Sequence, residues 1–254
     1  MPIRIPFLAL LIAAAAPLPA LAGPMEAVVA RAVAAPGRPA DMVALDAGRQ
    51  PAKVLDFLGL KPGERVLDFA AGGGYYTEIL ARSVGPKGMV IGFEHPSFVE
   101  EEKARKGWEA LLARQKNARL MSVPIGQFAA APNSFDFVLF HLVYHDLYWE
   151  SEKYKYPRID PARVLSMLFS VVKPGGIVGV VDHVGPAGDT REVVEKFHRI
   201  DPETIKADFA KAGFVLDGES DLLRNPGDAH DKLVFDPAIR GKTDRVILRF
   251  RKPG

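Results

Sequence analysis

The chain has 254 residues, 48% of them hydrophobic, and is therefore long enough to bury the core of one sizeable domain. Its 33 lysines and arginines nearly balance its 31 aspartates and glutamates, and no basic run stands out, which argues against a nucleic-acid partner. Because cysteine is absent, thiol catalysis, thiolate metal sites and disulfides are excluded.

Residues 1–22 have the features of a secretory signal peptide. Arg4 precedes an apolar run over Phe7–Ala16, and Ala20-Leu21-Ala22 offers small residues for cleavage. The run is short for a bilayer span, so an uncleaved anchor is the weaker alternative. We expect an exported protein of the periplasm or cell envelope, whose mature chain begins at Gly23 and has no membrane span.

Residues 23–60 are predicted to form a helical lead-in that caps a larger domain. Helical spacing of apolar residues predicts helices over Met25–Val33 and Ala40–Leu58. Pro36-Gly37 separates the two helices, and Pro62-Gly63 follows the second, because proline and glycine stop helices. The larger α/β domain is expected to span residues 61–254.

One stretch after the lead-in carries the strongest functional signal. It is predicted to form a strand, a glycine-rich turn, a helix and a second strand, over Arg65–Phe69, Ala70–Gly74, Tyr76–Val84 and Met89–Glu94. The glycines let the backbone approach a ligand closely, and the helix behind them offers unpaired N–H groups. The Glu94 carboxylate is able to accept hydrogen bonds from both hydroxyls of a ribose. The unit therefore predicts a nucleoside site.

The rest of the chain continues the alternation of helices and strands. Helices are predicted over Ser97–Gln115, Asp160–Val172 and Asp201–Gly213, with Trp108 in the core. Strands are predicted over Ala118–Val123, Ser134–Phe140, Ile177–Asp182, Phe214–Leu216 and Arg245–Arg251. The stretch Lys173–Gly176 is expected to close a helix, and residues 220–244 to form a polar insertion.

Three motifs indicate a family. The pattern Asp-x-Ala-x-Gly-x-Gly over Asp68–Gly74 resembles the first motif of class I S-adenosylmethionine-dependent methyltransferases, which usually have glycine at the position of Ala70. Ser134–Phe140 resembles their fourth-strand motif, and Pro174-Gly175-Gly176 before an apolar strand is characteristic of them. The resemblance covers about residues 50–254. Together with the leader, it resembles bacterial proteins described as predicted exported methyltransferases.

The resemblance implies an α/β, Rossmann-like sheet of seven strands in the order 3-2-1-4-5-7-6, with the last strand antiparallel and helices on both faces. It implies S-adenosylmethionine as cofactor and a small-molecule acceptor, with oxygen, nitrogen or carbon receiving the methyl group. The implied cofactor-binding residues are Asp68, Ala70, Ala71, Gly72, Gly73, Gly74, Glu94, Gln127 and His141. An acid that this family often uses for adenine is missing from residues 124–128, where Gln127 is the candidate substitute.

Residues 141–149 follow the fourth predicted strand and combine two histidines, one acid and three aromatic residues. This composition suits a lid or substrate wall at the edge of the ligand cleft. A histidine that titrates near neutrality can remove a proton from a methyl acceptor. His145 beside Asp146 is the first candidate for this base and His141 the second. His183 and His198 are further candidates.

Two other functions compete with methyl transfer. His141 and His145, four residues apart, would share one helical face, and Asp146, Asp182 and His183 would add ligands for a metal-dependent hydrolase. Because the usual glutamate between such histidines is missing, no metal ligand is assigned. In the third interpretation, an exported protein with little S-adenosylmethionine at hand binds a nucleoside or small ligand without catalysis. The oligomeric state is left open.

Overall fold

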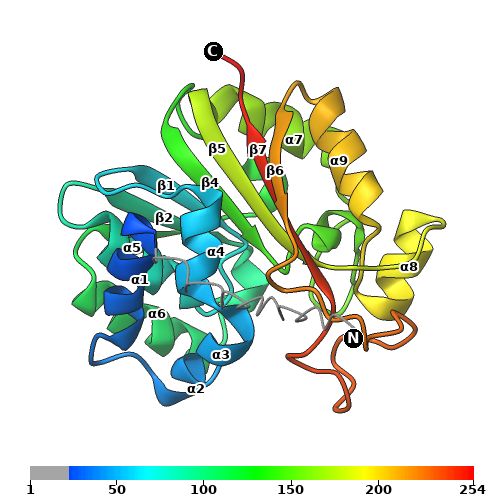
Figure 1. The fold of residues 1–254 in the computed structure, drawn as a ribbon, viewed down its shortest axis with the longest axis horizontal. Helices are drawn as coiled ribbons and strands as arrows, with labels where there is room; N and C mark the ends of the chain where they lie inside the picture. The colour runs from blue at the N-terminus through cyan, green and yellow to red at the C-terminus, as the bar shows by residue number, and fades with distance from the viewer. Residues whose placement is uncertain (1–22) are drawn as a thin grey trace, which may run out of the picture.

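The computed structural model describes residues 23–254, and the predicted leader, Met1–Ala22, lies outside the described residues. Seven strands form one sheet in the order β3-β2-β1-β4-β5-β7-β6 (Figure 1). Their bounds are β1 Arg65–Phe69, β2 Met89–Glu94, β3 Ala118–Ser122, β4 Phe135–His141, β5 Val172–His183, β6 Val215–Ser220 and β7 Arg245–Arg251. The strands β1 to β5 are parallel and β7 is antiparallel to both neighbours, which confirms the predicted topology.

Helices cover both faces of the sheet, as predicted (Figure 1). The helices are α1 Pro24–Ala34, α2 Ala40–Val43, α3 Asp46–Arg49, α4 Pro51–Leu58, α5 Tyr75–Val84, α6 Glu102–Arg114, α7 Pro161–Val171, α8 Thr190–Phe197 and α9 Pro202–Lys211. The core side chains of α1, α4, α5 and α6 pack on one face, and those of α7 and α9 on the other. Within the described residues, no helix is both long and apolar enough to span a bilayer.

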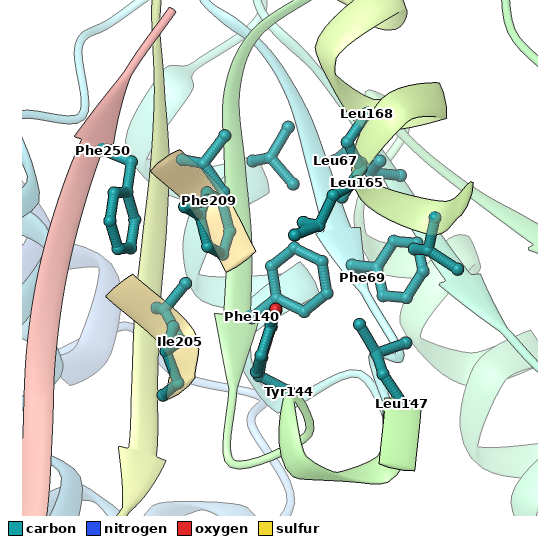
Figure 2. Packing of buried hydrophobic residues seen from close by; sticks show 14 of the residues in the cluster. Leu67, Phe69, Phe140, Tyr144, Leu147, Leu165, Leu168, Ile205, Phe209 and Phe250 are labelled. Carbon is teal, nitrogen blue, oxygen red and sulfur yellow. The ribbon is translucent and has the colours of Figure 1, made fainter. Parts of the chain in front are cut away.

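The central strands are apolar on both sides because each side is covered. Along β4, Phe137 and Leu139 belong to one core cluster, whereas Val138 and Phe140 belong to the other. In the second cluster, Phe209 of α9 stacks on Phe250 of β7, with ring centroids 4.0 Å apart (Figure 2). Both rings are almost fully buried. This packing fixes α9 against the antiparallel edge of the sheet.

Two predicted helices are wrong in their bounds. The single helix predicted over Ala40–Leu58 consists of α2, α3 and α4, because Gln50 has a left-handed φ of +42° and Pro51 starts a new helix. The helix predicted from Ser97 to Gln115 begins only at Glu102. A 3₁₀ turn over Pro96–Phe98 precedes it, and the His95 side chain caps that turn.

Three further differences concern the second half of the chain. Lys173–Gly176, predicted to close a helix, lies within β5, where the pairing with β4 shifts between Phe135 and Phe137 and accommodates the extra residues. The helix α8 was not predicted, and its N-terminus is capped by the Asp189 carboxylate. Strand β6 extends to Ser220, beyond the predicted Leu216.

Candidate active site

The glycine-rich turn between β1 and α5 is held against α6. The indole nitrogen of Trp108 donates a hydrogen bond to the Gly72 carbonyl oxygen at 3.0 Å, and the Trp108 side chain is buried, as predicted. Gly74 has a φ of +81°, and a Cβ there would lie 2.5 Å from the Leu111 side chain. The turn therefore needs glycine at this position, and α6 fixes its distance from the sheet.

Two buried carboxylates stand behind the turn. Glu94, at the end of β2, is 4% exposed and accepts hydrogen bonds from the backbone N–H groups of Gly72 at 2.5 Å and His95 at 2.7 Å. Asp68, in β1, accepts a bond from the Thr77 hydroxyl at 2.6 Å. Burial raises the pKa of each carboxyl to about 7, although these hydrogen bonds act in the opposite direction.

A cavity of about 650 Å³ lies at the carboxyl ends of the central strands and adjoins a second one of about 300 Å³. The two share the walls Ala70, Gly72, Gly73, Phe98, Val143, Asp146 and Trp149. Glu94 lines the smaller cavity, and the four histidines predicted as candidate bases line the larger one. Gln127, the predicted substitute for the adenine-binding acid, is exposed and lines neither cavity.

His145 is held in place by a buried aspartate. The Asp182 carboxylate lies 2.8 Å from His145 Nδ1 and also accepts the His145 backbone N–H at 2.9 Å. The other ring nitrogen, Nε2, lies 3.4 Å from Asp146. Burial alone would lower the pKa of His145, but the carboxylates of Asp182 and Asp146 outweigh it and raise this pKa to about 9. At neutral pH the ring is therefore protonated.

The other three predicted histidines also line the larger cavity, in different surroundings. Burial lowers the pKa of His141 and of His183 well below 6.5, and that of His198 to about 4. His183 bonds the Thr243 hydroxyl at 2.7 Å. His141 Nε2 and the Tyr76 hydroxyl are buried in the described chain without a hydrogen-bond partner. Buried polar atoms are normally paired, so this part of the cavity is suited to a polar ligand.

The helical arrangement proposed for the metal-dependent alternative is wrong. His141 ends β4, whereas His145 begins a 3₁₀ turn over His145–Tyr148, so the two histidines do not share a helical face. Leu142 between them has a left-handed φ of +61°, which turns the chain away from the strand direction. Of the predicted additional ligands, Asp146 and Asp182 do lie beside His145, and His198 joins His145 and Asp146 in place of His141.

Two residues that line the larger cavity, Arg49 and Phe235, were not predicted as site residues from the sequence. Arg49 comes from the lead-in and lies over the Tyr75 ring, 4.4 Å from its centroid. Burial lowers the pKa of Arg49 below its usual value. Phe235 comes from the segment predicted to be a polar insertion and packs on His198, with ring centroids 5.2 Å apart. Both depend on contacts between distant parts of the chain, which a local pattern does not reveal.

Aromatic side chains form the outer wall of the cavity. Phe98 and Tyr154 stack with ring centroids 5.7 Å apart, and Trp149 lies 5.9 Å from the Tyr154 ring. Phe98, Tyr154 and Phe235 are 37%, 39% and 52% exposed, so the rim of the cavity is apolar. Of the three aromatic residues in 141–149, only Trp149 belongs to this wall, because Tyr144 is buried in the core and the Tyr148 hydroxyl bonds Asp208.

The backbone at Ala70 explains the glycine that the family motif usually has. Ala70 has a φ of +54°, a left-handed conformation that costs a non-glycine residue about 1–2 kcal/mol. We expect Ala70→Gly to raise the free energy of unfolding by about 1 kcal/mol or less, because glycine also gains entropy in the unfolded chain. Urea denaturation measures this change. Ala71→Gly is the matched control and should destabilise; equal destabilisation by both would contradict the strain.

Comparisons with known proteins agree with this architecture. The sequence profile of the protein-L-isoaspartate(D-aspartate) O-methyltransferase family matches residues 43–120. The arsenite methyltransferase of Halobacterium salinarum is 30% identical over 162 residues, covering 63% of this chain and 36% of that protein. The ubiquinone/menaquinone biosynthesis C-methyltransferase UbiE of Pasteurella multocida is 27% identical over 146 residues, covering 57% and 49%. The chain thus spans about a third to a half of these curated relatives.

A solved S-adenosylmethionine-dependent methyltransferase from Aquifex aeolicus has the same fold. Its TM-score is 0.58 at 21% identity, and the match covers 85% of this chain and 99% of that chain. The sequence matches and the order of the seven strands both indicate a methyltransferase of this fold. The chain has the fold of class I S-adenosylmethionine-dependent methyltransferases and resembles methyltransferases in sequence over part of its length.

Proposed function

We propose that this protein transfers a methyl group from S-adenosylmethionine to a small molecule, and that it does so outside the cytoplasm. The observation that carries the proposal is the pair of adjoining cavities, which run from Glu94 and the glycine-rich turn to the histidines and Asp146. One end suits a nucleoside and the other an acceptor, with Gly72 and Gly73 between them.

The residues of the smaller cavity fit the nucleoside part of the cofactor. Glu94 offers a buried carboxylate for the ribose hydroxyls, and its bond to Gly72 ties it to the turn. Further along, His141 Nε2 and the Tyr76 hydroxyl are buried and unpartnered in the described chain, so they suit polar groups of a bound ligand. When bound, S-adenosylmethionine supplies the methyl group as an electrophile.

The larger cavity suits an acceptor with apolar parts and one acidic group. The aromatic wall of Phe98, Trp149 and Tyr154 would exclude water and orient the acceptor. His145, protonated at neutral pH, is suited to hold an anionic oxygen rather than to act as the predicted base. Asp146, whose pKa burial raises to about 6, is ionised at pH 7 and is suited to take a proton. The relatives are named for different acceptors and assign none here.

Methyl transfer is tested with methyl-labelled S-adenosylmethionine and a small-molecule extract of the envelope of the source cells. The proposal predicts label in an extracted product that depends on the protein and is lost in Asp146→Asn. If the protein binds the cofactor but no extract accepts label, the non-catalytic interpretation replaces it. The loop over residues 124–128 has no acid for adenine, and its predicted substitute, Gln127, lies outside both cavities. This observation favours the non-catalytic alternative.

Export rests on the sequence of residues 1–22 alone. We expect the protein to be recovered from the periplasm or cell envelope with Gly23 as its first residue. Mass spectrometry of the isolated protein and cell fractionation measure the two parts of this prediction. A cytoplasmic protein that keeps Met1 would show that residues 1–22 do not direct secretion.

A further inference from the structure

Three side chains converge at the junction of the two cavities. His145 and Asp146 come from the 3₁₀ turn after β4, and His198 directly follows α8. One ligand atom from each residue lies within 4.8 Å of the other two. All three line the larger cavity, and Asp146 also lines the smaller one. The cluster therefore faces the space where the cofactor and the acceptor would meet.

The distances between these atoms fit a common metal ion. His145 Nε2 lies 3.4 Å, and His198 Nδ1 3.9 Å, from the same oxygen of Asp146. A first-row metal binds such ligands at about 2.0–2.1 Å, so two ligands at the tetrahedral angle are about 3.4 Å apart. Small side-chain rotations would therefore close the cluster on one ion.

A buried carboxylate orients the central histidine for this purpose. Asp182 is fully buried, and its carboxylate lies 2.8 Å from His145 Nδ1. A metal ion that binds here displaces the Nε2 proton of His145, and the contact with Asp182 keeps the remaining proton on Nδ1, so that the Nε2 lone pair is directed towards Asp146. Metal-binding histidines almost always have such a partner on the second nitrogen.

The side chain of His198 is also held in a fixed position. His198 has a left-handed φ of +50°, and its ring packs between Trp149 and Phe235, at 5.5 and 5.2 Å between centroids. The next residue, Arg199, is fully buried and bonds the Val184 carbonyl oxygen at 3.0 Å. The loop that carries His198 is thus anchored to the end of β5, close to Asp182.

We propose that His145, Asp146 and His198 bind one divalent transition-metal ion such as Zn²⁺. Two imidazoles and one carboxylate match the ligand preferences of these metals, and three protein ligands leave coordination positions open towards the cavity. The negative charges of Asp146 and Asp182 offset the charge of the ion. This site differs from the arrangement in which His141 and His145 share a helix. In the metal-bound protein His145 and Asp146 serve as ligands, so the roles given to them above apply to the metal-free site, and metal binding does not depend on methyl transfer.

The test is calorimetric titration of the untagged protein with Zn²⁺ after removal of metals by chelation, without S-adenosylmethionine. We expect one ion per chain and at least tenfold weaker binding in His198→Ala and in Asp146→Asn. Asp182→Asn, which removes the orienting carboxylate, should weaken binding by about 10–100-fold. The matched control is His230→Gln, because His230 also pairs with an aspartate, Asp244 at 2.9 Å, but lies outside the cavities.

Circular dichroism shows whether each variant is folded. For the wild-type protein, the visible absorption of bound Co²⁺ is a second readout that needs no substitution. We expect this absorption to change on binding and to saturate at one equivalent of Co²⁺ per chain. A folded wild-type protein that binds neither ion stoichiometrically would overturn the proposal. So would folded His198→Ala and Asp146→Asn variants that retain full affinity. Binding of S-adenosylhomocysteine to metal-free protein is measured separately, so failure of the metal site and failure of the proposed function are distinguishable.

Discussion

Replacing Glu94 with alanine should weaken the binding of S-adenosylhomocysteine by about a hundredfold or more. In the proposed complex the carboxylate accepts two bonds from the ribose, and hydrogen bonds to a charged group contribute about 1.5–3 kcal/mol each. Loss of both corresponds to at least about 3 kcal/mol, or about two factors of ten in affinity. Calorimetric titration of the wild-type and variant proteins at pH 8 measures the difference.

The pH dependence of binding provides a second readout at Glu94. Burial raises the pKa of this carboxyl from 4.5 to about 7, so in the ligand-free protein its charge is lost as the pH falls through 7. Because the ionised form is the stronger acceptor, affinity should decrease as the pH falls from 8 to 6. Glu94→Gln should bind weakly at both pH values, with a flatter pH profile.

The control for Glu94 is Glu109→Gln on the outer side of α6, where the glutamate side chain is 61% exposed. This variant should bind S-adenosylhomocysteine as the wild-type protein does. If Glu94→Ala retained full affinity in a folded protein, the ribose would lie elsewhere. The interpretation of the glycine-rich turn as a nucleoside site would then be wrong.

Replacing Trp108 should affect both stability and ligand binding. Truncation of a buried tryptophan costs about 3–5 kcal/mol, so Trp108→Ala should lower the free energy of unfolding by that amount. Trp108→Phe keeps most of the apolar contact but removes the bond to the Gly72 carbonyl oxygen. It should cost about 1–3 kcal/mol, because that oxygen loses its partner. Urea denaturation measures both values.

The same two variants separate packing from the positioning of the turn. If Trp108 fixes the glycine-rich turn, Trp108→Phe should weaken binding of S-adenosylhomocysteine several-fold in a protein that is still folded. A phenylalanine variant with lower stability but unchanged affinity would show that the indole serves the core alone. The Gly72–Glu94 bond would then be sufficient to hold the turn.

The fold was predictable from the sequence because its signals are local. Each central strand is a short apolar run, and turns rich in glycine or proline separate the strands from the helices. The errors fell where a local signal was weak or ambiguous. The helix predicted over Ala40–Leu58 runs through Pro51, although the preceding Gln50 is left-handed, and the helix end predicted at Lys173–Gly176 is an irregular part of strand β5.

The candidate site was predictable only in part. The glycine-rich turn, Glu94, His141, His145 and His183 lie within or close after recognisable strands, so their gathering at one sheet edge follows from the topology, whereas His198 follows the unpredicted helix α8. Arg49, Phe235 and the pairing of His145 with Asp182 depend on contacts between distant segments. The sequence predicts His145 as a base but does not reveal the two surrounding carboxylates that raise its pKa to about 9.

The most direct test of the account is calorimetric titration of the purified protein with S-adenosylmethionine and S-adenosylhomocysteine. The account predicts one site per chain for each ligand, with affinity in the micromolar range and loss of binding in Glu94→Ala. A folded protein that binds neither ligand would contradict it. The methyltransferase fold would then hold a different molecule in the cavities beside Glu94 and His145.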